Sequence, residues 1–200
     1  MKYRFQILEK RLCYEGFFRL EAYRVRHELF KGGWSQVLNR ELLQRGHAAA
    51  LLPYDPNLDC VCMIEQFRIG ALEDDATPWL LEFVAGIIEQ GETAEQVALR
   101  EAMEESGLTV LELLPVSVFS LSPGACSERI HLFCGRVDAT SAGGVHGVTE
   151  EGEDIRVRVI PFSETLALLR ANKITSATAI IALQWLALNR DGLRKRWQSR

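Results

Sequence analysis

The sequence predicts an α+β fold, a sandwich in which a mixed sheet carries helices on its faces, preceded by an N-terminal β-rich portion. Apolar and charged residues alternate with period two from Phe18 to Arg26, and short apolar runs and helical segments follow. A chain of 200 residues can hold one domain with an extra subdomain. We expect residues 1–45 to form a β-rich subdomain, or an arm that pairs with a second copy, and residues 46–200 to form the main domain.

The strands expected in the main domain are short apolar runs bounded by turn residues. They cover residues 48–53, 60–67, 80–84, 110–119, 130–137 and 155–160. The loop between the last two strands, residues 140–153, is rich in glycines and acids, so we expect it to be exposed and mobile.

Three helices are expected. The first covers residues 93–105, because Thr93 and Gln96 have the spacing of a capping box and Gly107 lies just past the end. Ser163 and Ser176 can cap the other two. On the first helix, the residues expected to supply apolar contact are Leu99, Ala102 and Met103.

The composition argues against several classes of partner. The formal net charge is −4 and the only basic cluster is a short C-terminal one, so we expect no nucleic-acid partner. The longest apolar segment, residues 179–188, is too short to span a bilayer, and the N-terminus does not resemble a signal peptide. We therefore expect no membrane partner. The odd number of cysteines, five, indicates reduced thiols in or near the core and a cytoplasmic location.

Acidic residues gather on the first predicted helix. Glu101 and Glu105 are four residues apart and lie on one stripe, with Glu104 beside them. Like charges at this spacing repel, and burying an ionised carboxylate without compensation is costly. A divalent cation such as Mg²⁺ resolves both problems, and Arg100 can orient a neighbouring carboxylate. The alternative for any pair of glutamates is a solvated acidic face.

The spacing around this helix favours the metal. From Gly86 to Leu108 the chain has Gly, five residues, Glu, seven residues, Arg-Glu, an apolar residue, any residue, Glu-Glu, any residue, Gly and an apolar residue. This segment resembles the Nudix box at every specified position and without a gap. The resemblance implies an α/β/α sandwich in which the box forms a loop, a helix and a loop. It also implies a hydrolase of nucleoside diphosphates linked to another moiety.

A second similarity concerns the substrate. Pro123, within Ser122-Pro123-Gly124, follows Gly107 by sixteen residues, as in the ADP-ribose pyrophosphatase branch of the family. Further similar segments span most of the chain from Gly16 to Trp185. The resemblance implies Mg²⁺-dependent hydrolysis of ADP-ribose to AMP and ribose 5-phosphate by a metal-activated water with a glutamate base. Mn²⁺ is a possible substitute for Mg²⁺, and a homodimer is expected.

The resemblance also implies roles for individual residues. The expected metal ligands are the Ala85 carbonyl, Glu101, Glu104, Glu105 and Glu153. The expected substrate contacts are Phe17, Phe18, Arg40, Glu41, Arg45, Arg68, Ile87, Ser122, Pro123, Gly124 and Glu128. Glu151 is the expected general base, with Glu150 and Glu153 as alternatives in the same loop.

Alternatives remain open at this point. Phe17 and Phe18 also suit the core of a strand, and Arg40 and Arg45 also suit a solvated strand face. The competing functions are hydrolysis of another nucleotide sugar such as GDP-mannose, or of oxidised nucleotides; a nucleotide-sensing module that does not hydrolyse its ligand; and a purely structural partner-binding domain.

Overall fold

The computed structural model describes residues 3–73 and 77–198, which divide into two compact units. Unit 1 consists of the residues up to His47 together with Ser120–Arg129. Unit 2 consists of Ala48–Phe119 together with the residues from Ile130 onward. We describe each unit by itself. The predicted division into residues 1–45 and 46–200 as separate domains stays a prediction.

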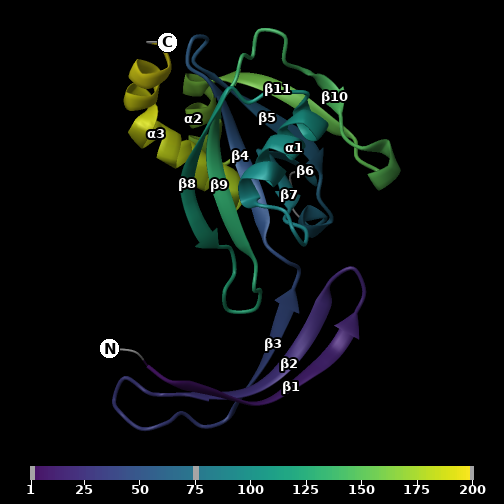
Figure 1. Ribbon diagram of the computed structural model, residues 1–200, viewed down its shortest axis with the longest axis vertical. Helices are drawn as coiled ribbons and strands as arrows, with labels where there is room; N and C mark the ends of the chain where they lie inside the picture. Colours follow the sequence, from purple (N-terminus) through teal and green to yellow (C-terminus); the bar gives the residue numbers. More distant parts are fainter. Residues whose placement is uncertain (1–2, 74–76, 199–200) are drawn as a thin grey trace. The chain divides into compact units, whose positions relative to one another are not determined.

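Unit 1 is built on an antiparallel sheet with the strand order β1-β2-β3, shown in purple and dark blue in Figure 1. The strands are β1 (Phe5–Glu15), β2 (Arg19–His27) and β3 (Leu38–Gln44). Every residue of β1 is exposed, including large apolar side chains. The segment 120–129 joins β3 through backbone hydrogen bonds, since the Leu43 N–H donates to Ala125 O over 2.8 Å.

A buried carboxylate links the parts of unit 1. Glu21 on β2 accepts hydrogen bonds from the Tyr23 hydroxyl at 2.7 Å and from Gln44 Nε2 at 3.0 Å, and pairs with Lys10 Nζ at 2.9 Å. These partners, the tyrosine first, lower the pKa of Glu21 to about 2. Gln44 Oε1 in turn accepts from Ser127 Oγ. One network therefore connects all three strands with segment 120–129.

Unit 2 is built on a mixed sheet with the strand order β10-β11-β5-β4-β9-β8, to which β6 adds beside β5 and β7 beside β4. The strands are β4 (Ala48–Asp55), β5 (Cys60–Phe67), β6 (Trp79–Glu82), β7 (Val84–Ile87), β8 (Glu112–Ser120), β9 (Arg129–Arg136), β10 (Gly144–His146) and β11 (Ile155–Pro161). The helices are α1 (Ala94–Ser106), α2 (Phe162–Arg170) and α3 (Ala177–Gln198), with short 3₁₀ turns η1 (Ile69–Ala71) and η2 (Thr149–Glu151). The pair β4/β9 is parallel, and β4/β5 is antiparallel.

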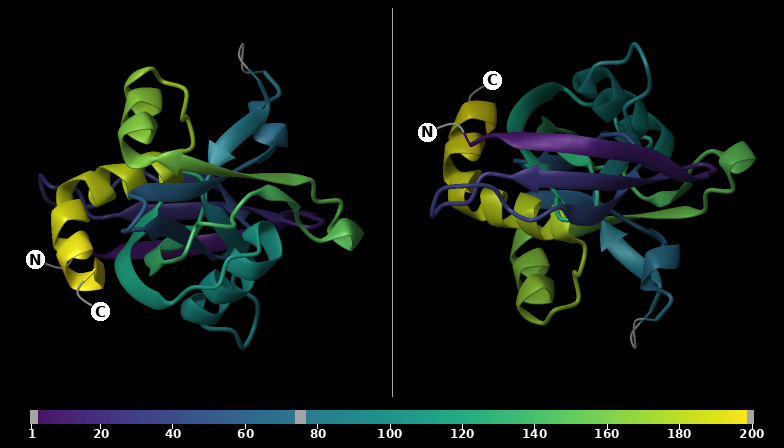
Figure 2. Two further views of the ribbon diagram at one scale, coloured as in Figure 1. Left: turned by 90° about the horizontal axis from the view of Figure 1, so that it is seen from above. Right: turned by 90° about the horizontal axis from the view of Figure 1, so that it is seen from below.

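Both faces of this sheet are buried. On β4, Ala48, Ala50 and Leu52 belong to the core that includes α3, whereas Ala49 and Leu51 belong to the core that includes α1. This alternation follows from the period of two in a strand. Figure 2 shows α1 on one side of the sheet and α2 with α3 on the other. The predicted α/β/α sandwich is confirmed.

Helix α1 begins and ends where the sequence predicts. Thr93 and Gln96 form the capping box, and Gly107 adopts the left-handed conformation with φ +65°. The prediction that Leu99 and Met103 supply apolar contact is wrong, because these side chains are 44% and 51% exposed. The helix instead turns short side chains and two polar ones to the interior. Its buried residues are Val97, Ala98, Ala102, Glu105 and Ser106.

Two other expectations need correction. The predicted strand at residues 80–84 divides at Phe83, since β6 pairs with β5 while β7 pairs with β4. The segment 140–153 is not one continuous loop, because it contains β10 and η2, and β10 pairs with β11. Its expected mobility stays a prediction. The division at Phe83 depends on the pairing of β7 with β4, which lies far back in the sequence, and no local pattern carries that information.

The five cysteines are all free, but they are not all near the core. Cys60, Cys62 and Cys134 are buried and Cys126 is half-buried, as predicted, whereas Cys13 is exposed because it lies on β1. In residues 3–73 and 77–198, no helix combines the length and the apolar character that crossing a membrane requires.

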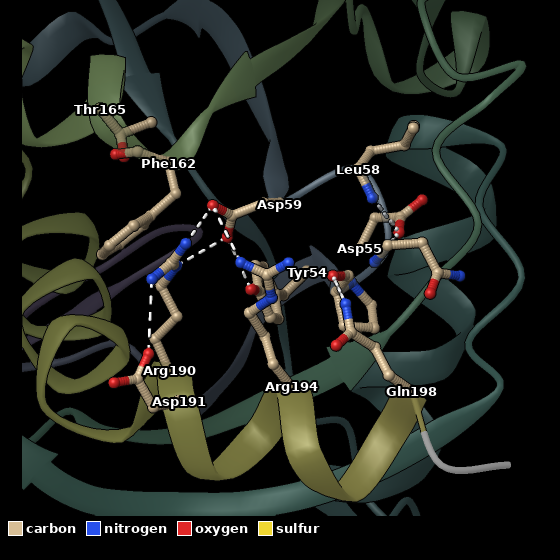
Figure 3. Close-up of polar contacts among 12 residues, drawn as sticks. Tyr54, Asp55, Leu58, Asp59, Phe162, Thr165, Arg190, Asp191, Arg194 and Gln198 are labelled. Carbon is tan, nitrogen blue, oxygen red and sulfur yellow. Dashed lines mark hydrogen bonds and ion pairs between the residues drawn. The ribbon is translucent and has the colours of Figure 1, made fainter.

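A polar cluster joins the C-terminal helix α3 to the turn between β4 and β5 (Figure 3). Asp59 accepts hydrogen bonds from the Tyr54 hydroxyl at 2.8 Å and from Arg190 Nε at 2.7 Å, and pairs with Arg194 at 3.7 Å. Asp59 has a positive φ of 54°. The hydrogen bonds from Arg190 lower the pKa of the Asp59 carboxyl.

We predict that Asp59→Asn lowers the free energy of unfolding by about 1–3 kcal/mol at neutral pH, the usual range for a charge-assisted hydrogen bond. Asn tolerates a positive φ, so the change removes mainly the charge. Because the folded pKa is depressed, the stabilisation is present above the unfolded pKa of about 3.9 and is lost as pH falls further. Urea unfolding at several pH values measures it. Asp191→Asn, at a side chain 88% exposed, is the control. An Asp59→Asn effect that does not shrink at acidic pH would contradict the assignment.

Candidate active site

Glu105 on α1 is one of two carboxylates of unit 2, with Asp55, that are almost completely buried. Only 2% of its surface is exposed, and its carboxylate accepts a hydrogen bond from the Ala85 N–H at 2.9 Å. Burial raises the pKa of Glu105 to about 8; the Ala85 N–H opposes the shift, and Glu101 and Glu153 add to it. The N–H and C=O of one strand residue point to the same side. The Ala85 carbonyl therefore faces the edge of β7 at which Glu105 lies.

Glu101 lies against β7 at the next residue. A Cβ atom on Gly86 would stand 1.7 Å from Glu101 Oε1, so only glycine leaves room for this carboxylate. Burial raises the pKa of Glu101, and Arg100 opposes the shift. Arg100 Nη1 donates to Glu101 at 2.9 Å and to Glu104 at 2.8 Å. The predicted orienting role of Arg100 is confirmed, and Glu104 is half-exposed on the arginine side.

Two further charged residues lie close enough to influence these acids. The charge of Glu153 raises the pKa values of both Glu101 and Glu105, whereas the charge of Arg68 lowers that of Glu105. Arg68 Nε donates to Glu82 Oε2 at 2.6 Å. A guanidinium has five N–H donors, so this bond leaves others for an anionic ligand. Glu153 Oε2 accepts from the Val148 N–H at 2.9 Å.

The donors in this region suit a hard divalent cation. They are carboxylates and a carbonyl, and the buried Glu105 lacks a cationic partner in direct contact among the ion pairs of the described residues. No three His, Cys, Asp or Glu side chains within the described ranges form a closed metal cage. Mg²⁺ does not need one, because it uses one or two carboxylates and completes its shell with water and substrate phosphates.

The candidate bases lie on η2 and just after it. Glu150 and Glu151 are both exposed, within the 3₁₀ turn that follows β10. Gly152 ends this turn with φ +73°. An exposed carboxylate suits a base that must meet water, and both residues meet this requirement. Glu153 is half-buried, and its charge raises the pKa values of Glu101 and Glu105.

In unit 1, several predicted substrate residues form one cluster. Glu128 is 4% exposed and pairs with Arg45 at 3.3 Å. The Arg45 guanidinium lies over the Phe18 ring, 5.3 Å from its centroid. Phe18 meets Phe17 edge to face at 4.8 Å, and Phe17 is 86% exposed. Phe18 is thus a platform for Arg45, while Phe17 is open to a ligand. The alternative of a core position does not apply to Phe17.

Arg40, Glu41 and Gly124 line a groove of about 570 Å³ on the sheet of unit 1, together with Arg11 and Arg24. The Ser122 carbonyl oxygen accepts hydrogen bonds from the N–H groups of Ala125 and Cys126. Ser122 and Pro123 are both exposed. In unit 2, Ile87 ends β7, opposite Ala48. The roles of these residues as substrate contacts stay predictions.

Comparison with known proteins places the chain in a family. The model of the NUDIX domain matches residues 44–181. ADP-ribose pyrophosphatase of Escherichia coli K12 is 50% identical over 192 residues, covering 96% of this chain and 92% of that protein. The Haemophilus influenzae protein of the same name is 46% identical over 196 residues, covering 96% and 90%. This chain belongs to the Nudix family.

Other relatives of this Nudix protein are named for a different activity. GDP-mannose pyrophosphatase of Pectobacterium atrosepticum is 32% identical over 183 residues, which cover 89% of this chain and 91% of that protein. A crystal structure of an ADP compounds hydrolase superposes with a TM-score of 0.71 over 97% of this chain and 96% of that one. At 21% identity, that likeness supports the Nudix fold alone. The predictions of a Nudix hydrolase and of its fold are confirmed.

Sequence reasoning did not assign some residues of this region. Glu82 pairs with Arg68, and Glu92 accepts from Arg100 Nε at 3.2 Å. Glu92 occupies a specified position of the box, so the sequence marked it as a candidate. The sequence did not identify Arg100 as its partner. Gln66 is 7% exposed, and its Nε2 finds no hydrogen-bond acceptor among the residues that the structure describes. Nothing in the sequence pointed to that buried amide.

We predict a pH-dependent stability that Glu105 controls in the metal-free protein. Its folded pKa of about 8 exceeds the ordinary 4.5, so between these values the folded protein keeps a proton that the unfolded chain releases. Stability is therefore lost as pH rises through this window. The free energy of unfolding of the wild type, relative to Glu105→Gln, should fall by about 2–4 kcal/mol from pH 4.5 to 8.

Urea unfolding in the presence of a chelator measures this difference. Excess Mg²⁺ should restore the free energy of unfolding that the wild type loses at pH 8. Glu104→Gln, at a half-exposed carboxylate beside Glu105, is the control. A difference between wild type and Glu105→Gln that stays constant across the window would show that the carboxyl is not desolvated.

Proposed function

We propose that this Nudix hydrolase cleaves the pyrophosphate bond of ADP-ribose, giving AMP and ribose 5-phosphate, with Mg²⁺ as its cation and Mn²⁺ as a possible substitute. The observation that carries the proposal is the pair Glu101 and Glu105, held at β7 by Gly86 and Ala85 within an intact box. Nudix enzymes of this kind generally depend on a divalent cation. The choice of Mg²⁺ rests on the all-oxygen donor set.

ADP-ribose is favoured over other nucleotide sugars by the relatives. Proteins named ADP-ribose pyrophosphatase are 46–50% identical to this chain, whereas those named GDP-mannose pyrophosphatase are 29–32% identical. GDP-mannose is therefore the second candidate substrate. A sensor without hydrolytic activity is not favoured, because Glu101, Glu104 and Glu105 are all present.

The residues that would hold the cation are Glu101 and Glu105, with the Ala85 carbonyl, Glu104 and Glu153 as further donors. Neutralisation of the diphosphate charge and activation of a water molecule are the chemistry that a bound divalent cation supplies. Arg68, whose free N–H groups lie beside these acids, would bind a non-bridging phosphate oxygen. Its ion pair with Glu82 fixes the direction of the guanidinium.

Glu151 would accept a proton from the attacking water. The water oxygen forms a new bond to phosphorus, the bridging P–O bond breaks, and its electron pair leaves with the departing phosphate. Both products then carry a terminal phosphate, one as AMP and one as ribose 5-phosphate. The exposure of Glu151 on η2 supports this role, because a base must reach solvent water before the substrate arrives.

Unit 1 also has residues that we propose as ligand contacts. Phe17 would stack on adenine, since its ring is exposed and edge-packed on Phe18. Arg45 would contact the ligand from its position between Phe18 and Glu128. Its Nε is buried and has no hydrogen-bond partner in the described part of the chain. The predicted contacts in the groove and the adjoining turn are Arg40, Glu41, Ser122, Pro123 and Gly124.

We also propose that the protein is a homodimer that uses β1. This strand forms one edge of its sheet, and Phe5, Ile7 and Leu12 are 70%, 54% and 48% exposed. An edge strand with exposed apolar side chains is a template for pairing with another chain. A nucleic-acid or membrane partner is not proposed, and the cytoplasmic location stays a prediction.

The deciding experiment is incubation of the full chain with ADP-ribose, with and without Mg²⁺, followed by identification of the products. We expect AMP and ribose 5-phosphate only with the cation. A parallel incubation with GDP-mannose tests the second candidate. If neither substrate is consumed in the presence of Mg²⁺ or Mn²⁺, the proposed function is wrong.

The role of Glu151 has its own prediction. Glu151→Gln should lower kcat by about 10²–10⁴-fold, the usual contribution of a general base, with KM nearly unchanged. Glu150→Gln is the matched control, since both residues are exposed on the same turn. If the kcat of Glu150→Gln falls instead, the base is Glu150.

The dimer is tested by light scattering in solution, which should give twice the mass of the chain. We predict that Leu12→Asp shifts the population toward monomer, because a charge on β1 disfavours the apolar contact. Val145→Asp, at a 67% exposed position on β10, should not. A wild type that scatters as a monomer would rule out the dimer.

A further inference from the structure

Gly107, which ends the box helix α1, has a neighbour that the sequence did not connect with it. A Cβ atom on Gly107 would stand 2.8 Å from Cε1 and 3.3 Å from Nδ1 of His146, on β10. Side-chain carbons do not approach ring atoms so closely, so His146 occupies space that only a glycine leaves. Gly107 thus meets two requirements at once, its φ of +65° and the contact with the imidazole ring.

The imidazole is also fixed from its other side. His146 Nε2 lies 2.8 Å from Gly143 O, and a carbonyl oxygen can only accept, so this nitrogen is the N–H donor. The next residue bonds to the helix itself: the Gly147 N–H donates to Glu104 O over 3.2 Å. That carbonyl is one of the last four of α1, which have no partner within their own helix. The end of the helix and β10 are therefore joined at two points.

The loop that carries the remaining acids begins directly after this junction. Gly147 has φ +107°, and a Cβ there would stand 2.7 Å from Cβ of Glu153. The Val148 N–H donates to the Glu153 carboxylate at 2.9 Å, and the Glu153 N–H donates back to Val148 O at 3.3 Å. The loop from residue 148 to residue 153 is thus closed on itself. A displacement of β10 would move it as a whole.

We propose that His146 is a positioning residue for the hydrolytic reaction. By occupying the space beside Gly107, it holds β10 against the end of α1 and so keeps the acidic loop, with Glu151 and Glu153, in place relative to Glu101 and Glu105. The imidazole takes no part in the chemistry. The inference rests on the proposed function, because it assigns Glu151 and Glu153 to the same site as the box acids.

The test is a double-mutant cycle in the full chain with Gly107→Ala and His146→Ala, measuring kcat and KM for ADP-ribose under saturating Mg²⁺. Misplacement of catalytic groups by about 1 Å can cost about 100-fold in rate, so we expect His146→Ala to lower kcat about 10- to 100-fold. KM should change much less. Gly107→Ala should be as harmful alone, but should add about twofold or less in the His146→Ala background, because the collision is then gone.

Gly33→Ala is the control for backbone strain, since Gly33 has φ +79° and a Cβ there meets nothing within 4 Å among the described residues. Its kcat should stay at the wild-type value. Hydrogen exchange gives a readout without substrate: the amides of Gly147 and Glu153 should exchange faster in His146→Ala and Gly107→Ala, but not in Gly33→Ala.

Additive effects of the two changes, or unchanged kcat and unchanged exchange in His146→Ala, would overturn the proposal. If His146→Ala does not fold, His146→Phe keeps a ring beside Gly107 and removes only the donor to Gly143. Exchange of the loop at the wild-type rate is then the expected result, and faster exchange would contradict the proposal. If the wild type does not hydrolyse ADP-ribose while the exchange pattern appears as expected, the proposed function fails and the positioning role stands.

Discussion

The cost of burying the Glu105 carboxylate is the constraint on which the rest of unit 2 depends. An ionised carboxylate inside a protein is unfavourable unless hydrogen bonds and opposite charge compensate it. The Ala85 N–H supplies one hydrogen bond, but Glu101 and Glu153 add negative charge instead of removing it. Arg100 donates hydrogen bonds to Glu101 and Glu104 and not to Glu105. In the metal-free protein a proton neutralises this carboxylate, and a bound divalent cation would take the place of that proton. The burial of Glu105 therefore accounts for both the local geometry and the proposed metal site.

That burial in turn requires close approach between α1 and the sheet. Alanines on the buried side of the helix and Gly86 on β7 remove the side chains that would keep the two apart. Gly86 makes room for Glu101 and Gly107 makes room for His146. Both glycines of the box thus act through the atom that they lack, at opposite ends of the acidic stripe. One brings a carboxylate to the strand, and the other brings β10 to the helix.

Local signals made α1 predictable and non-local pairing limited the rest. The capping box at Thr93 and the left-handed Gly107 depend on neighbours within a few residues, so the sequence contains them. The division of residues 79–87 between β6 and β7 and the membership of segment 120–129 in unit 1 depend on partners far along the chain. The exposure of Leu99 and Met103 was missed for the same reason, since helical period alone does not say which stripe faces the sheet.

The same separation between local and distant information bears on substrate choice. The box determines the hydrolytic chemistry, yet proteins named for ADP-ribose and for GDP-mannose both match about nine tenths of this chain or more. Discrimination between these two nucleotide sugars therefore does not come from an added domain. It comes from side chains outside the box. Unit 1 offers such a set. Phe18 supports Arg45, and the buried Glu128 holds that arginine. In the proposed site the base would therefore meet the exposed Phe17. A stacked ring alone accepts either purine, because every base has a π-face. If the proposed substrate is correct, selectivity for adenine would reside in the polar groups around the ring, where a donor or acceptor left unpaired by the wrong base is penalised.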